Sequence, residues 1–190
     1  SLGLTTEAAR GLARLALDRV RSAHAVLLTS ATIPMLLAGE EFGDIHDTNH
    51  SAWQLKMSDP VDWWRQDTDG RRELVAAVAD LIHLRTGHPA LHRNEVVLFH
   101  AHPTIDDAAG ARVFAYCRTA GRPLGSGGQV VVVANLGHQD WPQYRIPWPW
   151  PTAPVERGAA PGADAPGVGA DGWAGMHLAP FAVRVFETPG

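Results

Sequence analysis

Residues 29–43 read TSATIPMLLAGEEFG, and the rest of the chain is arranged around this stretch. Its apolar run ends at Gly39 and is followed at once by two acids, Glu40 and Glu41. Pro34 disfavours a helix, and the run MLLA behind it has the length and continuous apolarity of a strand buried on both faces of a parallel sheet. Periodicity does not separate such a run from a buried helix, so both assignments stay open at this point.

The segment before this stretch predicts a helix over residues 6–29. Apolar residues recur there at helical spacing and predict its buried stripe: Leu12, Ala16, Val20, Ala23 and Leu27. Charged residues occupy the opposite face, where Asp18 is placed to pair with Arg14 or Arg21. A solvated face is the expected role of these charges.

A polar, aromatic-rich loop over 43–70 separates this helix from a second one, expected over 71–86 and ended by Gly87 and Pro89. The predicted inner stripe of the second helix includes the aliphatic stem of one arginine: Leu74, Val78, Leu81, Ile82 and Arg85.

The second half of the chain changes to the period of β-strands. Strands are expected over four stretches rich in β-branched and aromatic residues: 95–100, 112–118, 129–135 and 181–187. A short strand is expected at 144–146, and the Pro/Gly/Ala-rich segment 147–172 is expected to be a surface excursion. Several short strands separated by turns favour an antiparallel β-sandwich, and the best boundary lies between His92 and Glu95.

Composition excludes some partners. The net charge of −4 and the pI near 6.2 argue against a basic surface for nucleic acid. We expect no membrane partner, because no apolar run has membrane-spanning length and no leader peptide is visible; the cytoplasm is the default location. The single cysteine, Cys117, is expected to be a small buried hydrophobe in a strand.

Glu40 and Glu41 invite comparison with the two carboxyl groups of a glycoside hydrolase, which lie about 5–9 Å apart across the scissile bond. On a strand, however, adjacent residues point to opposite faces, so these two are badly placed to share one substrate. One of them could line a cleft while the other meets the backbone of the following loop.

Histidine and tryptophan clusters have competing interpretations. The loop residues Asp44, His46, Asp47 and His50 have some metal-ligand character, but a solvated polar loop is favoured, and we expect no metal site and no cofactor. Two groups of tryptophans could stack on sugar rings or pack in the interior: Trp53, Trp63 and Trp64 in the loop, and Trp141, Trp148 and Trp150 near the chain's β half.

The order of these parts resembles the C-terminal part of α-amylase-family glycoside hydrolases, especially the pullulanase, isoamylase and glycogen-branching groups. The resemblance is carried by IPMLLAGEEFG, DPVDWW, VAAVADLIHLRTGHPAL and LAPFAVRVFE, and it extends over nearly the whole chain. It implies an α+β chain in which residues 1–93 are the remnant of a (β/α)₈ barrel, with two helices and one strand, and residues 94–190 form a β-sandwich. Thr32 stands where the family commonly has glycine.

The resemblance also implies that the family's catalytic carboxylates precede this chain, so that none of its residues is expected to be catalytic. What it carries over is the periphery of a substrate cleft: Glu41, and with it Glu40, Asp44 and Trp53. The implied partner is an α-glucan. The sequence does not decide whether the reaction is hydrolysis or transglycosylation, or whether the linkage is α-1,4 or α-1,6.

Two other functions compete with an incomplete glucan-active enzyme: a carbohydrate-binding or interaction module, and a divergent complete enzyme that uses Glu41, His46 and Asp47. A barrel strand and two barrel helices without their neighbours leave apolar faces uncovered. We therefore expect helices 6–29 and 71–86 to pack together beside the β domain. The 33–39 strand should then be short or poorly paired, and the exposed apolar surface should be able to self-associate.

Overall fold

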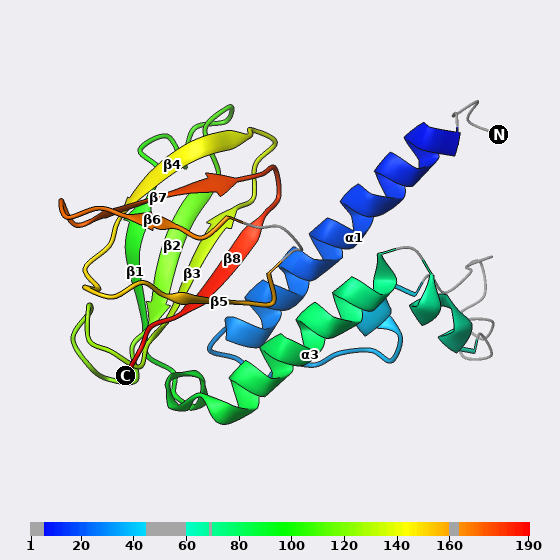
Figure 1. Ribbon diagram of the computed structural model, residues 1–190, viewed down its shortest axis with the longest axis horizontal. Coiled ribbons are helices and arrows are strands. Elements are labelled where there is room, and N and C mark those ends of the chain that lie inside the picture. The colour runs from blue at the N-terminus through cyan, green and yellow to red at the C-terminus, as the bar shows by residue number, and fades with distance from the viewer. Residues whose placement is uncertain (1–5, 45–59, 69, 160–163) are drawn as a thin grey trace.

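The computed structural model describes residues 6–44, 60–68, 70–159 and 164–190. In this part of the chain, a pair of long helices and two antiparallel sheets form three layers (Figure 1). The helices cover one face of the larger sheet, and the smaller sheet covers its other face. The expected α+β class with an antiparallel β-sandwich is confirmed.

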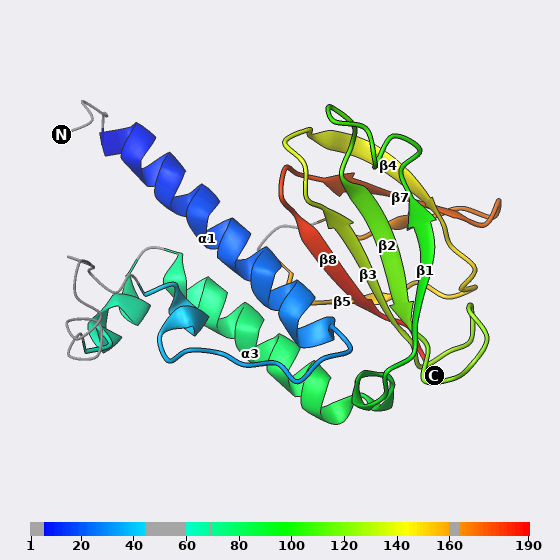
Figure 2. The ribbon, with the colours of Figure 1, turned by 180° about the vertical axis from the view of Figure 1, so that it is seen from behind.

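The helices are α1, Thr6–Thr29, and α3, Arg71–Gly87, close to the predicted ranges. Short 3₁₀ turns connect the other parts: η1, Glu40–Phe42; η2, Trp63–Asp67; and η3, Pro89–His92. The two helices lie side by side next to the sandwich, as expected (Figure 2). Among the described residues, no helix is long and apolar enough to span a membrane.

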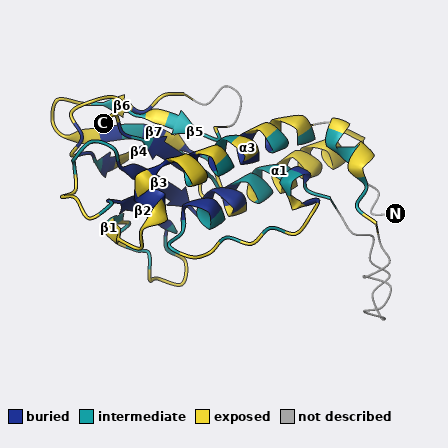
Figure 3. Cartoon of the chain, turned by 90° about the horizontal axis from the view of Figure 1, so that it is seen from below, coloured by how far each residue is buried: buried dark blue, intermediate teal, exposed yellow. Residues whose placement is uncertain are grey.

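The predicted buried stripe of α1 is wrong in part, since Val20 does pack against the core. Leu12, Ala16 and Ala23 are exposed, whereas Ala25 and Leu28 are buried. The exposed half of α1 projects beyond the sandwich, and the buried residues of α1 gather at its end next to the sheets (Figure 3), whereas those of α3 are spread along the helix. The periodicity of the sequence identified one apolar face of α1, but the sheet and the second helix pack on a neighbouring face of this helix. The expected pairing of Asp18 is confirmed, since its carboxylate lies 2.8 Å from Arg21 Nη1.

The larger sheet has the order β1-β2-β3-β8-β5, and the smaller one β4-β7-β6. Their bounds are β1 Val96–Ala101, β2 Val113–Arg118, β3 Val130–Asn135, β4 Trp141–Pro147, β5 Val155–Arg157, β6 Gly167–Val168, β7 Trp173–Leu178 and β8 Val183–Glu187. The predicted strands are confirmed, but β5, β6 and β7 were missed. Residues 147–172, expected to be only a surface excursion, contain β5 and β6. These strands are three and two residues long, which is too short to give a recognisable β pattern in the sequence.

Strand β3 is buried along its whole length because it is covered on both faces. Val131 and Val133 pack in the core between the two sheets, while Val130 and Val132 pack against the helices. Cys117 lies in the core between the sheets, as expected, and burial raises the pKa of its thiol to about 12.

The apolar run that defines the chain is not a strand. Residues 33–37 have no regular structure, and Ile33, Met35 and Leu37 are 94%, 86% and 61% exposed. The interpretation as a strand buried on both faces is therefore wrong for this chain, and the expected poor pairing is confirmed. The physical reason is that no described strand lies beside this run to accept its backbone hydrogen bonds or cover its side chains.

Two arginines from other elements hold the end of α1. The helix has no basic residue in its own last turn. On β2, Phe114 and Tyr116 face the helices, so Arg118, which has the same parity, also points toward them. Its Nη1 donates to the carbonyls of Thr29 and Ser30, at 2.5 and 2.7 Å.

The same guanidinium group joins α1 to the start of the sheet, because its Nη2 donates to the carbonyls of Leu91 and Arg93. From α3, Arg85 donates to the carbonyls of Leu28, Ser30 and Thr32. Burial lowers the pKa of Arg118 from its ordinary value, and the charge of Arg85 lowers this pKa further. The positive charges compensate the partial negative charge and the unpaired carbonyls at the end of α1.

We predict that Arg118→Leu lowers the free energy of unfolding by about 2–4 kcal/mol, because buried carbonyl groups lose their donor. Arg122→Leu is the matched control, since Arg122 is exposed and its guanidinium donates to the carbonyl of Gly127 on the surface. This control should change stability by less than about 0.5 kcal/mol. Urea unfolding followed by tryptophan fluorescence measures both, and equal effects would contradict the assigned role of Arg118.

Candidate functional site

The apolar run ends in a tight turn that requires two glycines. Gly39 and Gly43 flank η1 with φ of 98° and 65°, a left-handed conformation that favours glycine. A Cβ on Gly39 would lie 2.9 Å from Cβ of Asp44 and 3.2 Å from Val61. The sequence AGEEFG thus forms this turn because its first glycine meets both a conformational and a steric requirement.

The two acids of the turn are bound to its own backbone. Glu41 accepts a hydrogen bond from the backbone N–H of Gly39 at 2.8 Å, and Glu40 accepts one from the N–H of Leu37 at 3.1 Å. The strand argument that pointed them to opposite faces is wrong, because both lie in a 3₁₀ turn. The sequence also predicted that one of these two carboxylates would contact the backbone of the loop, and the carboxylates of both Glu40 and Glu41 do so.

Asp44 fastens the turn to η2. Its side chain is 1% exposed, accepts a hydrogen bond from the backbone N–H of Asp62 at 3.0 Å, and pairs with Arg65 at 3.2 Å. Phe42 is fully buried, with its ring 5.7 Å from that of Trp63. The turn is therefore a packed structure rather than a loose loop.

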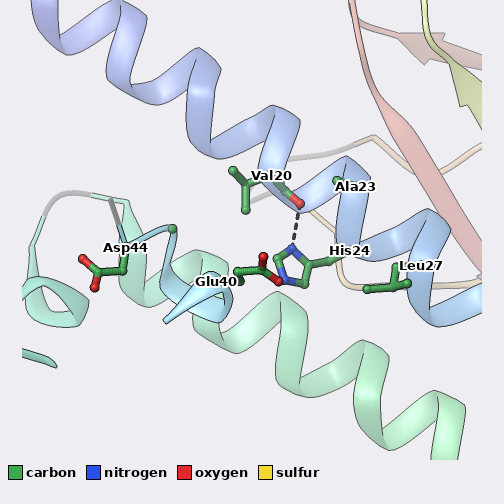
Figure 4. Close-up of a pocket in the computed structure, with 7 residues that line it drawn as sticks. Val20, Ala23, His24, Leu27, Glu40 and Asp44 are labelled. Carbon is green, nitrogen blue, oxygen red and sulfur yellow. Dashed lines mark hydrogen bonds between the residues drawn. The ribbon is translucent and has the colours of Figure 1, made fainter. Parts of the chain in front are cut away.

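A hollow of about 260 Å³ lies between the turn and α1. Its lining combines apolar residues of α1 with His24 and the polar groups of the turn: Val20, Ala23, His24, Leu27, Glu40, Gly43 and Asp44. Figure 4 shows Glu40 extending toward the α1 side of the hollow, whereas the carboxylate of Asp44 points away from it. Of the predicted site residues, Glu40 and Asp44 thus line one hollow, and Glu41 is not part of the lining.

His24 is the polar group that sequence reasoning missed. It is 5% exposed, and its Nδ1 lies 2.8 Å from the carbonyl oxygen of Val20 (Figure 4). Since a carbonyl only accepts, Nδ1 carries the proton, and Nε2 of the neutral ring is an acceptor. Nε2 is buried and has no hydrogen-bond partner among the described residues. The sequence signal that could have identified His24 is its position directly after Ala23, a residue of the predicted apolar stripe.

This arrangement offers a hydrogen-bond acceptor on His24 and a carboxylate on Glu40 at the wall of one hollow, which suits donors such as hydroxyl groups. In the described ranges, no three His, Cys, Asp or Glu side chains come together as a metal ion would require.

The predicted aromatic residues divide into two groups. Trp148 and Trp150 are buried in the core between the sheets, which confirms the packing interpretation for them. Trp63 and Trp64 are exposed on η2. Trp53 lies outside the described residues, as do His46, Asp47 and His50.

Comparison with known proteins gives relatives for part of the chain. No family model matches it. It is 43% identical over 81 residues to a glycogen debranching enzyme of Klebsiella pneumoniae subsp. pneumoniae, and 40% identical over 79 residues to one of Erwinia tasmaniensis. Each match covers 40% of this chain, and the chain spans only 12% of the length of these relatives.

Solved structures share the fold over nearly the whole chain. Apo pullulanase of Paenibacillus barengoltzii matches all of it with a TM-score of 0.62 and 22% identity, over 27% of its own length. AmyP E221Q in complex with maltotriose matches 92% of it with a TM-score of 0.64 and 19% identity, over 35% of its own length. The resemblance to the C-terminal part of α-amylase-family enzymes is confirmed.

We predict that Gly39→Ala lowers the free energy of unfolding by about 2–4 kcal/mol, because it adds a steric overlap to an unfavourable left-handed φ. Gly121→Ala is the matched control: Gly121 has φ of 73°, and a Cβ there meets nothing within 4 Å. This control should cost only about 1 kcal/mol. Urea unfolding of both variants tests the difference, and a Gly39→Ala cost no larger than the control's would refute the steric argument.

Proposed function

We propose that this chain is the C-terminal portion of an α-glucan-active glycoside hydrolase or glucanotransferase, with the catalytic carboxylates supplied by a part of the enzyme outside these 190 residues. The observation that carries the proposal is the identity of about two residues in five to glycogen debranching enzymes over 81 residues. Pullulanase and amylase structures with the same fold, some solved with maltotriose or maltotetraose, support an α-glucan as partner. Glycogen-processing relatives also favour the cytoplasm.

In this proposal, residues 1–93 belong to a catalytic barrel and residues 94–190 form its C-terminal sandwich. The support is the apolar surface that the chain leaves uncovered. Ile33, Met35 and Leu37 are exposed in one unpaired segment, and Leu12 and Leu15 are exposed on α1. Continuous exposed apolar side chains of this kind are the ones that neighbouring barrel strands and helices would bury.

The turn at η1 then forms part of the rim of the substrate cleft. Glu41, Glu40, Asp44 and Trp53 are the proposed rim residues. Active sites of such barrels lie at the carboxyl ends of the strands, and η1 follows the apolar run at its carboxyl end. The hydrogen bonds of Glu40 and Glu41 to their own turn favour a role in shaping the rim rather than in proton transfer.

A second candidate is a non-catalytic carbohydrate-binding or interaction module. The observation in its favour is the exposure of Trp63 and Trp64, whose rings are available to a ligand.

An activity assay tests the main proposal. The purified chain should release no reducing sugar from glycogen or pullulan above the blank, because the proposed catalytic carboxylates are not part of it. Turnover by the chain alone that is lost in Glu41→Gln would overturn this assignment in favour of a complete divergent enzyme.

The uncovered surface gives a further prediction. Replacing Ile33, Met35 and Leu37 together by serine should reduce self-association in sedimentation velocity, since these side chains supply the exposed apolar patch. The same change should alter the free energy of unfolding by less than about 0.5 kcal/mol, because exposed side chains have little burial to lose.

Val155→Ser is the matched control, since Val155 is 55% exposed but lies on β5, away from the apolar run. This substitution should leave self-association unchanged. A loss of stability in the triple variant, or an equal effect of the control, would contradict the proposed patch.

A further inference from the structure

The aromatic ring of Trp173 is exposed on the outer face of the smaller sheet. On β7, Ala174, Met176 and Leu178 point into the core between the sheets, so Trp173 and Gly175 point outward. Trp173 is 40% exposed. None of the packing described above uses this ring.

Charged groups are fixed around the ring. The guanidinium carbon of Arg145, on the adjacent strand β4, lies 5.5 Å from the centre of the Trp173 ring. Nη2 of Arg145 donates to Asp171, whose other carboxylate oxygen accepts the backbone N–H of Trp173 at 3.2 Å. This backbone hydrogen bond, and then Arg145, holds the pKa of Asp171 below its ordinary value. The carboxylate is therefore ionised at neutral pH and oriented from both sides.

Two glycines lie in the sheet beside the ring. Gly175 pairs with Arg145 on one side and with Gly167 of β6 on the other, so a row across the sheet carries only one side chain. A Cβ on Gly175 would lie 3.2 Å from Oε1 of Gln143, which places the carboxamide over this glycine. We name the group Gln143, Arg145, Asp171, Trp173 and Gly175 the Trp173 platform.

The chemistry of this platform matches a sugar. A pyranose ring has an apolar C–H face that packs on an aromatic ring, and hydroxyl groups at its rim that need donors and acceptors. The guanidinium of Arg145 donates, the carboxylate of Asp171 accepts, and the carboxamide of Gln143 does both. A single aromatic ring among charged groups is too small for a stable protein interface.

We propose that the Trp173 platform is a carbohydrate-binding site that takes pyranose residues of an α-glucan. The choice of an α-glucan rests on the proposed function, whereas the assignment of a sugar site rests on the residues of the platform alone. In Figure 1 the turn between β6 and β7 lies at the far left of the sandwich, whereas η1 lies beside the helices on the right. The platform thus anchors a polysaccharide at a distance from the proposed cleft rim.

The tryptophan indole N–H signals of the isotope-labelled chain, recorded by NMR during titration with maltohexaose, test the proposal. The signal of Trp173, assigned from its loss in Trp173→Phe, should shift and saturate at millimolar sugar. Trp173→Ala, which lacks this signal, should weaken binding of maltohexaose about tenfold in isothermal titration calorimetry, as expected for one aromatic contact. Gly175→Val should also weaken binding while leaving the ring in place, because a side chain at this position displaces the carboxamide of Gln143.

Trp64→Ala is the control, since Trp64 is more exposed than Trp173 but lies on η2. It should leave the shift of Trp173 unchanged. Shifts confined to Trp63 and Trp64 would overturn the platform and leave the proposed function standing. A shift of Trp173 with cellohexaose but not with maltohexaose would keep the sugar site and overturn the α-glucan assignment. No shift of Trp173 with either sugar would overturn the site altogether.

Discussion

The carboxyl end of α1 is held by guanidinium groups, and the arrangement of the layers depends on this contact. A helix ends with carbonyl groups that have no partner in the helix. Here those of Leu28, Thr29 and Ser30 accept hydrogen bonds from Arg85 of α3 and Arg118 of β2. Because Arg118 also binds the carbonyls of Leu91 and Arg93, one buried side chain joins the first helix, the η3 turn and the sheet.

This contact explains how the chain keeps an ordered helical layer although its apolar run is uncovered. Helix α1 packs on β8 and β3, and α3 packs on α1 and on β5, within one buried cluster that extends to Leu74 near the start of α3. The irregular segment 33–37 runs from that anchor toward the η1 turn. This turn is fixed separately by Asp44 and by Arg71, which donates to the carbonyls of Phe42 and Gly43. The run is thus held at both ends and open in the middle, as expected of a segment that packs against further elements.

Much of the fold was predictable because strand and helix periodicities are local. The ranges of α1, α3, β1, β2, β3 and β8 followed from runs of apolar residues at the right spacing. The candidate site was only half predictable. The motif located Glu40, Glu41 and Asp44, but it gave the acids a strand geometry, and it did not indicate that His24 would line the same hollow. Contacts between residues about 20 positions apart are decided by helix packing, which no local pattern encodes.

The sequence by itself determined the class of each long element, the resemblance to the α-amylase family and the place of the two glycines that make the η1 turn. Tertiary structure alone decided which face of α1 is buried, that the run MLLA forms no strand, and that Trp173 is exposed beside Arg145 and Asp171. The physical reason is the same in each case. An apolar or aromatic residue has a local preference for a backbone conformation, but its burial depends on which distant elements of the chain are present to cover it.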